Sequence, residues 1–175
     1  MPEAERRVAE RGAARLLRQL GVVLRARRMG VYLSVDGELG VETATADAQR
    51  RNTLTCAPVI EMNGLRFAPL RRETGLRENR LGILEPTRCT YVDPRWLDVV
   101  LTPLVAFDDS GTRLGMGAGY YDRCFEFLRS RSRWIRPKLI GVGYEFQRVS
   151  ALERRSWDVP LWAAVTERGV YQFDA

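Results

Sequence analysis

The sequence predicts an α/β protein with a mainly parallel central sheet covered by helices on both faces. Strand-like segments alternate with helix-like segments along the chain. Several strand-like segments are continuously apolar, as expected for strands buried on both faces. The chain has 175 residues, 45% of them hydrophobic, which suits one domain with a substantial core. We therefore expect residues 1–175 to form a single domain with three layers, α/β/α.

The expected elements follow from periodicity and turn residues. Apolar residues recur every three or four positions over 3–20, which predicts a helix that ends at Gly21. The most apolar run, 97–107, predicts a buried strand, whereas the polar stretch 71–95 predicts a long connection. The other expected strands are 29–33, 53–60, 65–70, 139–142, 163–165 and 170–173. Further helices are expected at 41–51 and 120–131.

Composition excludes several classes of chemistry. Histidine is absent, so no mechanism or metal site here uses an imidazole, and a metal should be a hard ion such as Mg²⁺. The three widely spaced cysteines, Cys56, Cys89 and Cys124, argue against a disulfide framework and a structural zinc site. No run is apolar enough for a membrane span or a signal peptide. We expect a cytoplasmic monomer without membrane contact.

The net charge of +6 is compatible with nucleic acid or with a small polyanion. In the first half of the chain the arginines are mixed with glutamates, and no basic block is interleaved with aromatic residues. We therefore expect no nucleic-acid partner, and a basic nucleic-acid binder stays as an alternative.

A glycine-rich segment carries the strongest functional signal. Residues 113–123 read RLGMGAGYYDR and connect the predicted strand to a predicted helix. Glycines at alternate positions permit close approach to a ligand, and the N–H groups that follow can bind phosphates. The spacing matches neither a dinucleotide fingerprint nor a Walker loop. Arg113 could pair with phosphate oxygens and Asp122 could hold Mg²⁺ beside them. The alternatives are a flexible turn and an acid favoured by the helix dipole.

The longer segment 102–123, TPLVAFDDSGTRLGMGAGYYDR, resembles the signature of 5-formyltetrahydrofolate cyclo-ligases. Similar segments occur in the family's order at 33–39 (LSVDGEL), 82–86 (GILEP) and 157–161 (WDVPL). The resemblance runs from about residue 29 to 173. It implies a Rossmann-like, NagB/RpiA/CoA-transferase-like fold. It also implies an ATP- and Mg²⁺-dependent ligase that converts 5-formyltetrahydrofolate, with or without a polyglutamate tail, to 5,10-methenyltetrahydrofolate, ADP and phosphate.

The resemblance also implies roles for individual residues. It makes Arg113, Tyr121 and Asp122 catalytic, and Asp122 and Asp158 the Mg²⁺ ligands. The folate would contact Leu33, Glu38 and Tyr120. The ATP phosphates would be lined by Arg113, Leu114, Gly115, Met116, Gly117, Ala118, Gly119, Tyr120 and Tyr121. Without the resemblance, the tyrosines read as core aromatics, Glu38 as a turn residue and Asp158 as a cap before a proline.

Family members usually begin with a longer helical region whose basic motif reaches ATP. Only 28 residues precede the strand expected at 29–33, so we expect a shortened N-terminal helix region. Arg6, Arg7 and Arg11 are candidates to substitute for that motif. The shortening leaves one alternative to an active ligase, namely a degenerate relative that binds nucleotide or folate without catalysis.

Overall fold

The computed structural model describes residues 2–35, 37–62, 64–87, 90–130 and 136–173. Over these residues the central sheet has seven strands in the order β11-β10-β9-β6-β1-β2-β3. The five inner strands are parallel, and the edge strands β3 and β11 are antiparallel to their neighbours. Their bounds are β1 (Arg28–Gly30), β2 (Leu54–Glu61), β3 (Gly64–Pro69), β6 (Val99–Pro103), β9 (Lys138–Val142), β10 (Ala163–Val165) and β11 (Val170–Gln172). The predicted sheet is confirmed.

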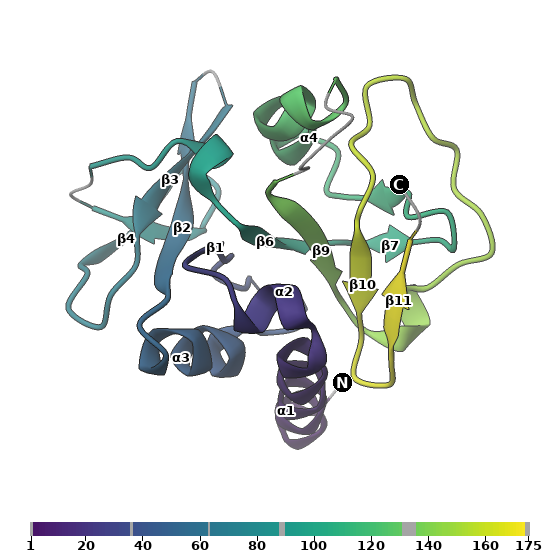
Figure 1. Ribbon diagram of the computed structural model, residues 1–175, viewed down its shortest axis with the longest axis horizontal. Helices are drawn as coiled ribbons and strands as arrows, with labels where there is room; N and C mark the ends of the chain where they lie inside the picture. The colour runs from purple at the N-terminus through teal and green to yellow at the C-terminus, as the bar shows by residue number, and fades with distance from the viewer. Residues whose placement is uncertain (1, 36, 63, 88–89, 131–135, 174–175) are drawn as a thin grey trace.

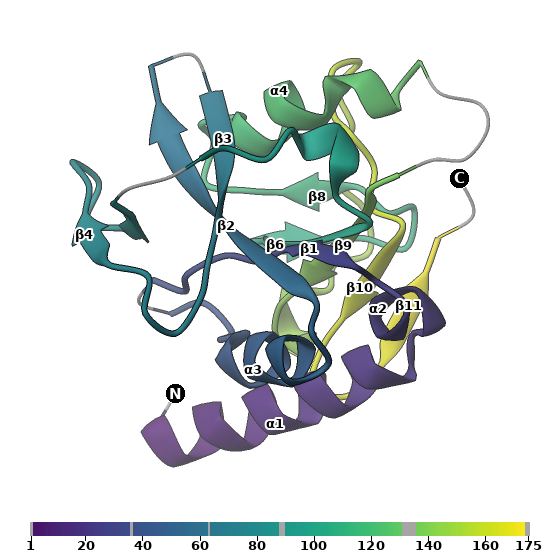
Figure 2. The ribbon, with the colours of Figure 1, turned by 60° about the vertical axis from the view of Figure 1, so that its left-hand side comes forward.

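Helices cover both faces of this sheet. α1 (Glu3–Gln19), α2 (Gly21–Leu24) and α3 (Glu42–Arg50) lie on one face, and α4 (Tyr120–Phe125) lies on the other (Figure 2). Three short 3-10 helices are η1 (Pro94–Trp96), η2 (Glu126–Leu128) and η3 (Glu145–Gln147). The three-layer arrangement is confirmed. No described helix is both long and apolar enough to cross a lipid bilayer.

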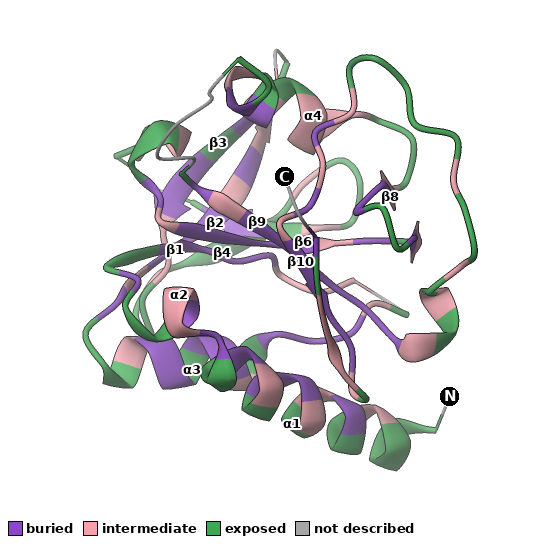
Figure 3. Ribbon diagram, turned by 45° about the vertical axis from the view of Figure 1, so that its right-hand side comes forward, coloured by how far each residue is buried: buried purple, intermediate pink, exposed green. Residues whose placement is uncertain are grey.

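The two faces of the inner strands contribute to two separate apolar clusters. In β6, Val99 and Leu101 belong to the cluster under α1 to α3, whereas Val100 belongs to the cluster under α4. On the α4 side, the rings of Phe67 and Phe125 lie 5.8 Å apart. Full burial of such side chains contributes about 1.5–3 kcal/mol each. Figure 3 shows these buried strands between α1, which has buried and exposed residues, and α4, whose residues are mostly intermediate in burial.

Several predicted bounds were wrong for a physical reason. The strand predicted at 97–107 ends at Pro103, and the chain then leaves the sheet to form β7 (Ala106–Phe107), which pairs with β8 (Arg113–Leu114). The apolar run continues past the strand because Leu104 and Phe107 are also buried, although the chain has changed direction. The helix predicted at 120–131 gives way to η2 after Phe125, and residue 131 lies outside the described residues, as does Cys89.

The stretch predicted as a long connection contains a hairpin, β4 (Leu76–Glu78) and β5 (Leu84–Pro86), on the side of β2 and β3 (Figure 1). Every residue of β4 is exposed, so no apolar alternation marked it. Buried Glu85 fixes the hairpin to the sheet. Its carboxylate accepts from Arg77 Nη2 at 3.0 Å and from the Ile60 N–H of β2 at 3.2 Å.

Candidate active site

The candidate site lies at the point where the strand order reverses. β1 lies between β2 and β6, so successive crossovers leave on opposite sides of it. In open α/β sheets, ligands bind in the crevice outside the carboxyl ends of two such strands. Leu33 and Glu38 follow β1, and the glycine-rich loop follows β6 and the β7–β8 hairpin. The fold thus places the two predicted ligand-binding segments at the same edge of the sheet.

The glycine-rich loop has an exposed backbone. Gly117 has φ of +85° and Gly119 has φ of +62°, in the left-handed region that favours glycine. A Cβ added at Gly115 or Gly117 would meet no heavy atom within 4 Å. Ala118 does not have a positive φ, so its methyl group causes no backbone strain. The loop therefore leaves open space beside its backbone for a ligand.

Arg113, Tyr121 and Asp122, all predicted to be catalytic, contact one another. Arg113 Nη2 lies 3.2 Å from each carboxylate oxygen of Asp122, and its guanidinium lies 5.2 Å from the centre of the Tyr121 ring. The Arg113 side chain is 5% exposed, and its Nε–H has no hydrogen-bond partner among the described residues. Asp122 also accepts from the Val159 N–H at 3.1 Å. Asp122 therefore does not serve only as an acidic residue in the first turn of α4, because it also pairs with the buried guanidinium of Arg113.

Glu38 reaches the same group of residues from the loop after β1. One of its carboxylate oxygens accepts from the Val35 N–H at 3.0 Å, and burial raises its pKa although that hydrogen bond opposes the shift. Burial raises the Tyr121 pKa strongly; Arg113 lowers it and Glu38 raises it further. Burial and then Glu38 likewise raise the pKa of Tyr32, whose hydroxyl donates to the Leu39 carbonyl. Glu38 thus lies within electrostatic range of both phenols.

Asp158 lies beside the cluster but is engaged locally. Its carboxylate accepts from the Arg155 N–H at 2.8 Å, which closes the turn before Val159. The long segment between η3 and β10 brings this turn to α4, because Val159 is bonded to Asp122 (Figure 1). Within the described chain, no group of three or more acidic or cysteine side chains could hold a metal ion.

The other predicted contact residues are at the rim. Leu33 and Tyr120 are partly buried, whereas Leu114 and Met116 are exposed. The Arg123 guanidinium lies 5.3 Å from the Tyr120 ring centre, and its Nη1 donates to the Ala118 carbonyl at 2.8 Å. Arg123 therefore ties the end of the loop to α4. Asp36 lies outside the described residues.

Comparison with known proteins identifies the family. The sequence model of the 5-formyltetrahydrofolate cyclo-ligase family matches residues 1–167. The 5-formyltetrahydrofolate cyclo-ligase of Escherichia coli K12 is 36% identical over 180 aligned residues, covering 98% of this chain and 94% of that protein. Its namesake from Haemophilus influenzae is 35% identical, covering 78% and 74%. The chain belongs to the 5-formyltetrahydrofolate cyclo-ligase family. The NMR structure of Aquifex aeolicus 5,10-methenyltetrahydrofolate synthetase matches with a TM-score of 0.83 at 28% identity, covering 100% of this chain and 86% of that one.

Membership of the cyclo-ligase family makes this chain an enzyme, a ligase of folate one-carbon metabolism. The match extends over nearly the full length, which supports the catalytic reading over the degenerate relative. The expected shortening of the N-terminal region stays a prediction. Burial raises the Tyr144 pKa and Arg6, one of the three candidate arginines, opposes this shift, while Arg7 pairs with Glu3 one turn earlier.

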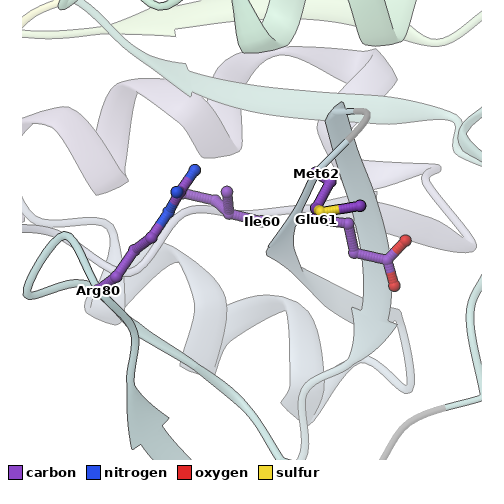
Figure 4. A pocket seen from close by; sticks show the side chains of 4 residues that line it. All are labelled: Ile60, Glu61, Met62 and Arg80. Carbon is purple, nitrogen blue, oxygen red and sulfur yellow. The ribbon is translucent and has the colours of Figure 1, made fainter.

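The sequence did not predict a pocket at the C-terminal end of β2 in this cyclo-ligase. A cavity of about 520 Å³ is lined by Ile60, Glu61, Met62 and Arg80. Figure 4 shows Arg80 extending toward Ile60, while the carboxylate of Glu61 points to the other side. Met62 is 97% exposed, and such exposure of a large apolar residue often marks a binding surface. In the sequence, only the apolar residues near the tip of this hairpin could have indicated the pocket.

The sequence also did not predict that the residues after β9 belong to the candidate site. Phe146 is 75% exposed and stacks on buried Tyr144, with ring centres 5.3 Å apart and an angle of 8°. Gln147 Nε2 donates to the carbonyls of Leu104 and Val105, and the Val105 N–H donates to the Leu114 carbonyl at 2.7 Å. An exposed aromatic ring is thereby held near the start of the glycine-rich loop. Tyr144 and Phe146 follow a buried parallel strand, and this position could have identified them as candidate site residues.

Proposed function

We propose that this protein uses ATP to convert 5-formyltetrahydrofolate to 5,10-methenyltetrahydrofolate, with release of ADP and phosphate. Family membership supports the reaction class. The observation that carries the proposal is that the buried guanidinium of Arg113 pairs with Asp122 at 3.2 Å and lies 5.2 Å from the Tyr121 ring centre, at the two ends of the glycine-rich loop. The ATP phosphates would be held at this cluster, next to the folate.

The glycine-rich loop would bind the ATP phosphates. The open space at Gly115 and Gly117 lets phosphate oxygens approach the backbone N–H groups. A phosphate oxygen would also satisfy the unpartnered Nε–H of Arg113, since a buried donor without an acceptor costs about 1–3 kcal/mol. Stacked Phe146 and the exposed apolar residues Val105 and Met116 offer a surface for the adenine ring.

Asp122 and Asp158 would hold Mg²⁺. The two carboxylates come from adjoining segments, and Mg²⁺ commonly takes only one or two protein carboxylates besides phosphate oxygens and water. When bound, the ion neutralises charge on the phosphates as the phosphoryl group moves. Arg113 keeps the Asp122 carboxylate in position within this cluster.

The folate would lie between the loop after β1 and the tip of β2. Glu38 would accept hydrogen bonds from the polar edge of the pterin, next to Leu33 and Tyr120. The pocket of Ile60 and Met62 would take the apolar middle of the molecule. Arg80 would pair with a carboxylate of the glutamyl tail, whether that tail has one unit or several.

In the reaction, the formyl oxygen attacks the γ-phosphorus, and the bond from that phosphorus to the bridging oxygen of ADP breaks. The neighbouring folate nitrogen then attacks the activated formyl carbon, loses its proton, and the carbon–oxygen bond breaks to release phosphate. Both steps depend mainly on positioning and charge stabilisation. The raised pKa of Tyr121 keeps its hydroxyl protonated, so it acts as a hydrogen-bond donor to the transferred group and not as a base.

The test is turnover by the purified protein. We expect methenyltetrahydrofolate absorbance to appear only when ATP, Mg²⁺ and 5-formyltetrahydrofolate are all present, with one ADP formed per product. The Asp122→Asn protein serves as the inactive control. A folded protein that binds both substrates without forming product would contradict the proposal.

A further inference from the structure

A second cleft lies at the opposite end of β2 from the candidate active site. It has a volume of about 600 Å³ and is formed where α3 ends, β2 begins and β3 ends. Figure 2 shows β2 running from the turn after α3 to its hairpin turn on the side of β4. The ATP and folate residues proposed above belong to the carboxyl ends of the strands, so this cleft uses a different edge of the sheet.

Three arginines give this cleft a positive charge. Arg50, Arg71 and Arg72 line it together with uncharged polar residues such as Asn52 and the apolar residues Ala46, Leu54 and Leu70, and among the described residues no acidic or aromatic side chain lines it. Arg71 and Arg72 are exposed, and neither forms an ion pair within the described part of the chain. Two arginines with solvated, unpaired guanidinium groups thus face one concave surface.

Acidic groups nearby only partly offset this charge. Asp47 is buried and shared between Arg50 and Arg18, whose Nη1 lies 2.5 Å away. Glu73 follows Arg72 and is exposed. Just before β6, which is separated from β2 by β1, Asp98 accepts the N–H groups of Arg27 and Arg28 and pairs with Arg136. Arginines therefore outnumber carboxylates at this edge of the sheet.

The end of α3 does not cancel the positive charge. A helix C-terminus carries partial negative charge on its last carbonyls. Here the Ala48 carbonyl accepts from the N–H groups of Arg51 and Thr53, and the Gln49 carbonyl accepts from Asn52. Asn52 has φ of +61°, which turns the chain from α3 into β2.

We propose that this cleft binds a small polyanion with clustered phosphate or carboxylate oxygens, at a site separate from catalysis. Arginine side chains match both groups geometrically through paired N–H donors. The volume is within the range of small-molecule sites. The absence of aromatic lining residues disfavours single-stranded nucleic acid, whose bases stack on such rings. The proposal does not depend on the cyclo-ligase reaction.

Two probes distinguish the possible sources of the anion, namely tripolyphosphate and a tetra-γ-glutamate peptide. Each is titrated into ¹⁵N-labelled protein whose catalytic site is filled with Mg²⁺ and a non-hydrolysable ATP analogue. We expect amide shifts at residues 49–55 and 70–72, saturating with a dissociation constant below about 1 mM for at least one probe. Response to tripolyphosphate alone identifies a phosphate ligand, and response to the peptide alone identifies a polycarboxylate. No saturable shift in these residues with either probe overturns the proposal.

The double variant Arg71→Ala/Arg72→Ala tests the lining. We expect the dissociation constant to rise at least about tenfold, with kcat and both KM values within about twofold of the parent. The matched control, Arg129→Ala/Arg154→Ala, removes the same charge from exposed positions elsewhere and should leave probe binding nearly unchanged. Equal weakening in both variants, or tighter binding of an oligonucleotide than of either probe at the same salt concentration, would show general charge attraction and sink the idea.

Discussion

The guanidinium of Arg113 contacts both carboxylate oxygens of Asp122, at 3.2 Å each, from the opposite end of the glycine-rich loop. The two residues are nine positions apart in the chain, and the loop between them leaves open space at Gly115 and Gly117. The ion pair therefore fixes the two ends of the proposed phosphate site before any ligand binds. This preorganisation is the property that a phosphoryl-transfer site needs.

Arg113→Ala should mainly damage the use of ATP. The change removes the buried guanidinium that we place against the phosphates, so kcat/KM for ATP should fall about 10²–10³-fold while KM for folate changes little. Arg113→Lys keeps the charge but loses the planar donors and should recover only part of the activity. Steady-state kinetics with each substrate varied in turn measures this. A defect confined to folate KM would show that the pocket assignment is reversed.

Asp122→Asn should abolish turnover and lower stability. The amide oxygen can still accept from the Val159 N–H, but the buried Arg113 guanidinium loses its negatively charged partner, so we expect the free energy of unfolding to fall by about 3 kcal/mol while the protein stays folded. The loss of negative charge should lower kcat by at least about 10²-fold and weaken Mg²⁺ dependence. Denaturant unfolding and an Mg²⁺ titration of activity are the two measurements. Full activity in this variant would refute the metal role.

Glu38→Gln should stabilise the fold while weakening folate binding. Burial raises the Glu38 pKa, so the ionised carboxylate is disfavoured in the folded state, and this cost applies at pH values above the unfolded pKa. A neutral amide removes the cost, and its oxygen can still accept from the Val35 N–H. At pH 7 we expect a higher Tm together with a folate KM raised about tenfold or more. A lower Tm with unchanged KM would assign Glu38 a purely structural role.

Two glycine substitutions separate backbone strain from ligand space. Gly117→Ala forces a side chain onto a φ of +85° and should cost about 1 kcal/mol in stability. Gly115→Ala meets nothing within 4 Å and should leave stability unchanged, yet raise KM for ATP because the methyl group occupies the space we assign to phosphates. Ala118→Gly is the matched control and should alter neither property much. Unchanged ATP kinetics in Gly115→Ala would argue against a phosphate loop.

Asp108 should stabilise the turn between β7 and β8, just before the glycine-rich loop, and the size of this effect should depend on pH. Burial opposes ionisation of this carboxylate, but hydrogen bonds from Ser110, Leu152 and Thr112 prevail and lower its pKa. A depressed carboxyl pKa gives stability that is present above the unfolded value near 4 and lost as the pH falls through the folded value. Asp108→Ala should cost about 2–4 kcal/mol at pH 7.

That cost should shrink toward pH 3, because the parent protein then loses the same contribution. Urea unfolding of both proteins across this pH range checks the expectation. A difference between the two proteins that stays constant with pH would contradict it.

Much of the fold could be predicted because its signals are local. The four-residue spacing of Ala9, Ala13 and Leu17 is typical of one face of a helix such as α1, and the continuous apolar run over β6 is typical of a strand buried on both faces. The β4–β5 hairpin could not be predicted in this way. Glu85 holds it through ion pairing and a contact with β2, 25 residues earlier, and neither leaves an apolar pattern in the sequence.

The sequence by itself determined the three-layer α/β class, the cyclo-ligase resemblance and the glycine-rich loop between Arg113 and Asp122, because these depend on residue type and spacing within short segments. Only the tertiary structure decided that the Arg113 guanidinium lies over Tyr121, that the Val159 N–H donates to Asp122, and that Arg71 and Arg72, which form no ion pair within the described residues, line a cleft where β2 begins. The reason is that such contacts depend on strand order and on the direction in which the chain leaves each strand, which local residue patterns do not specify.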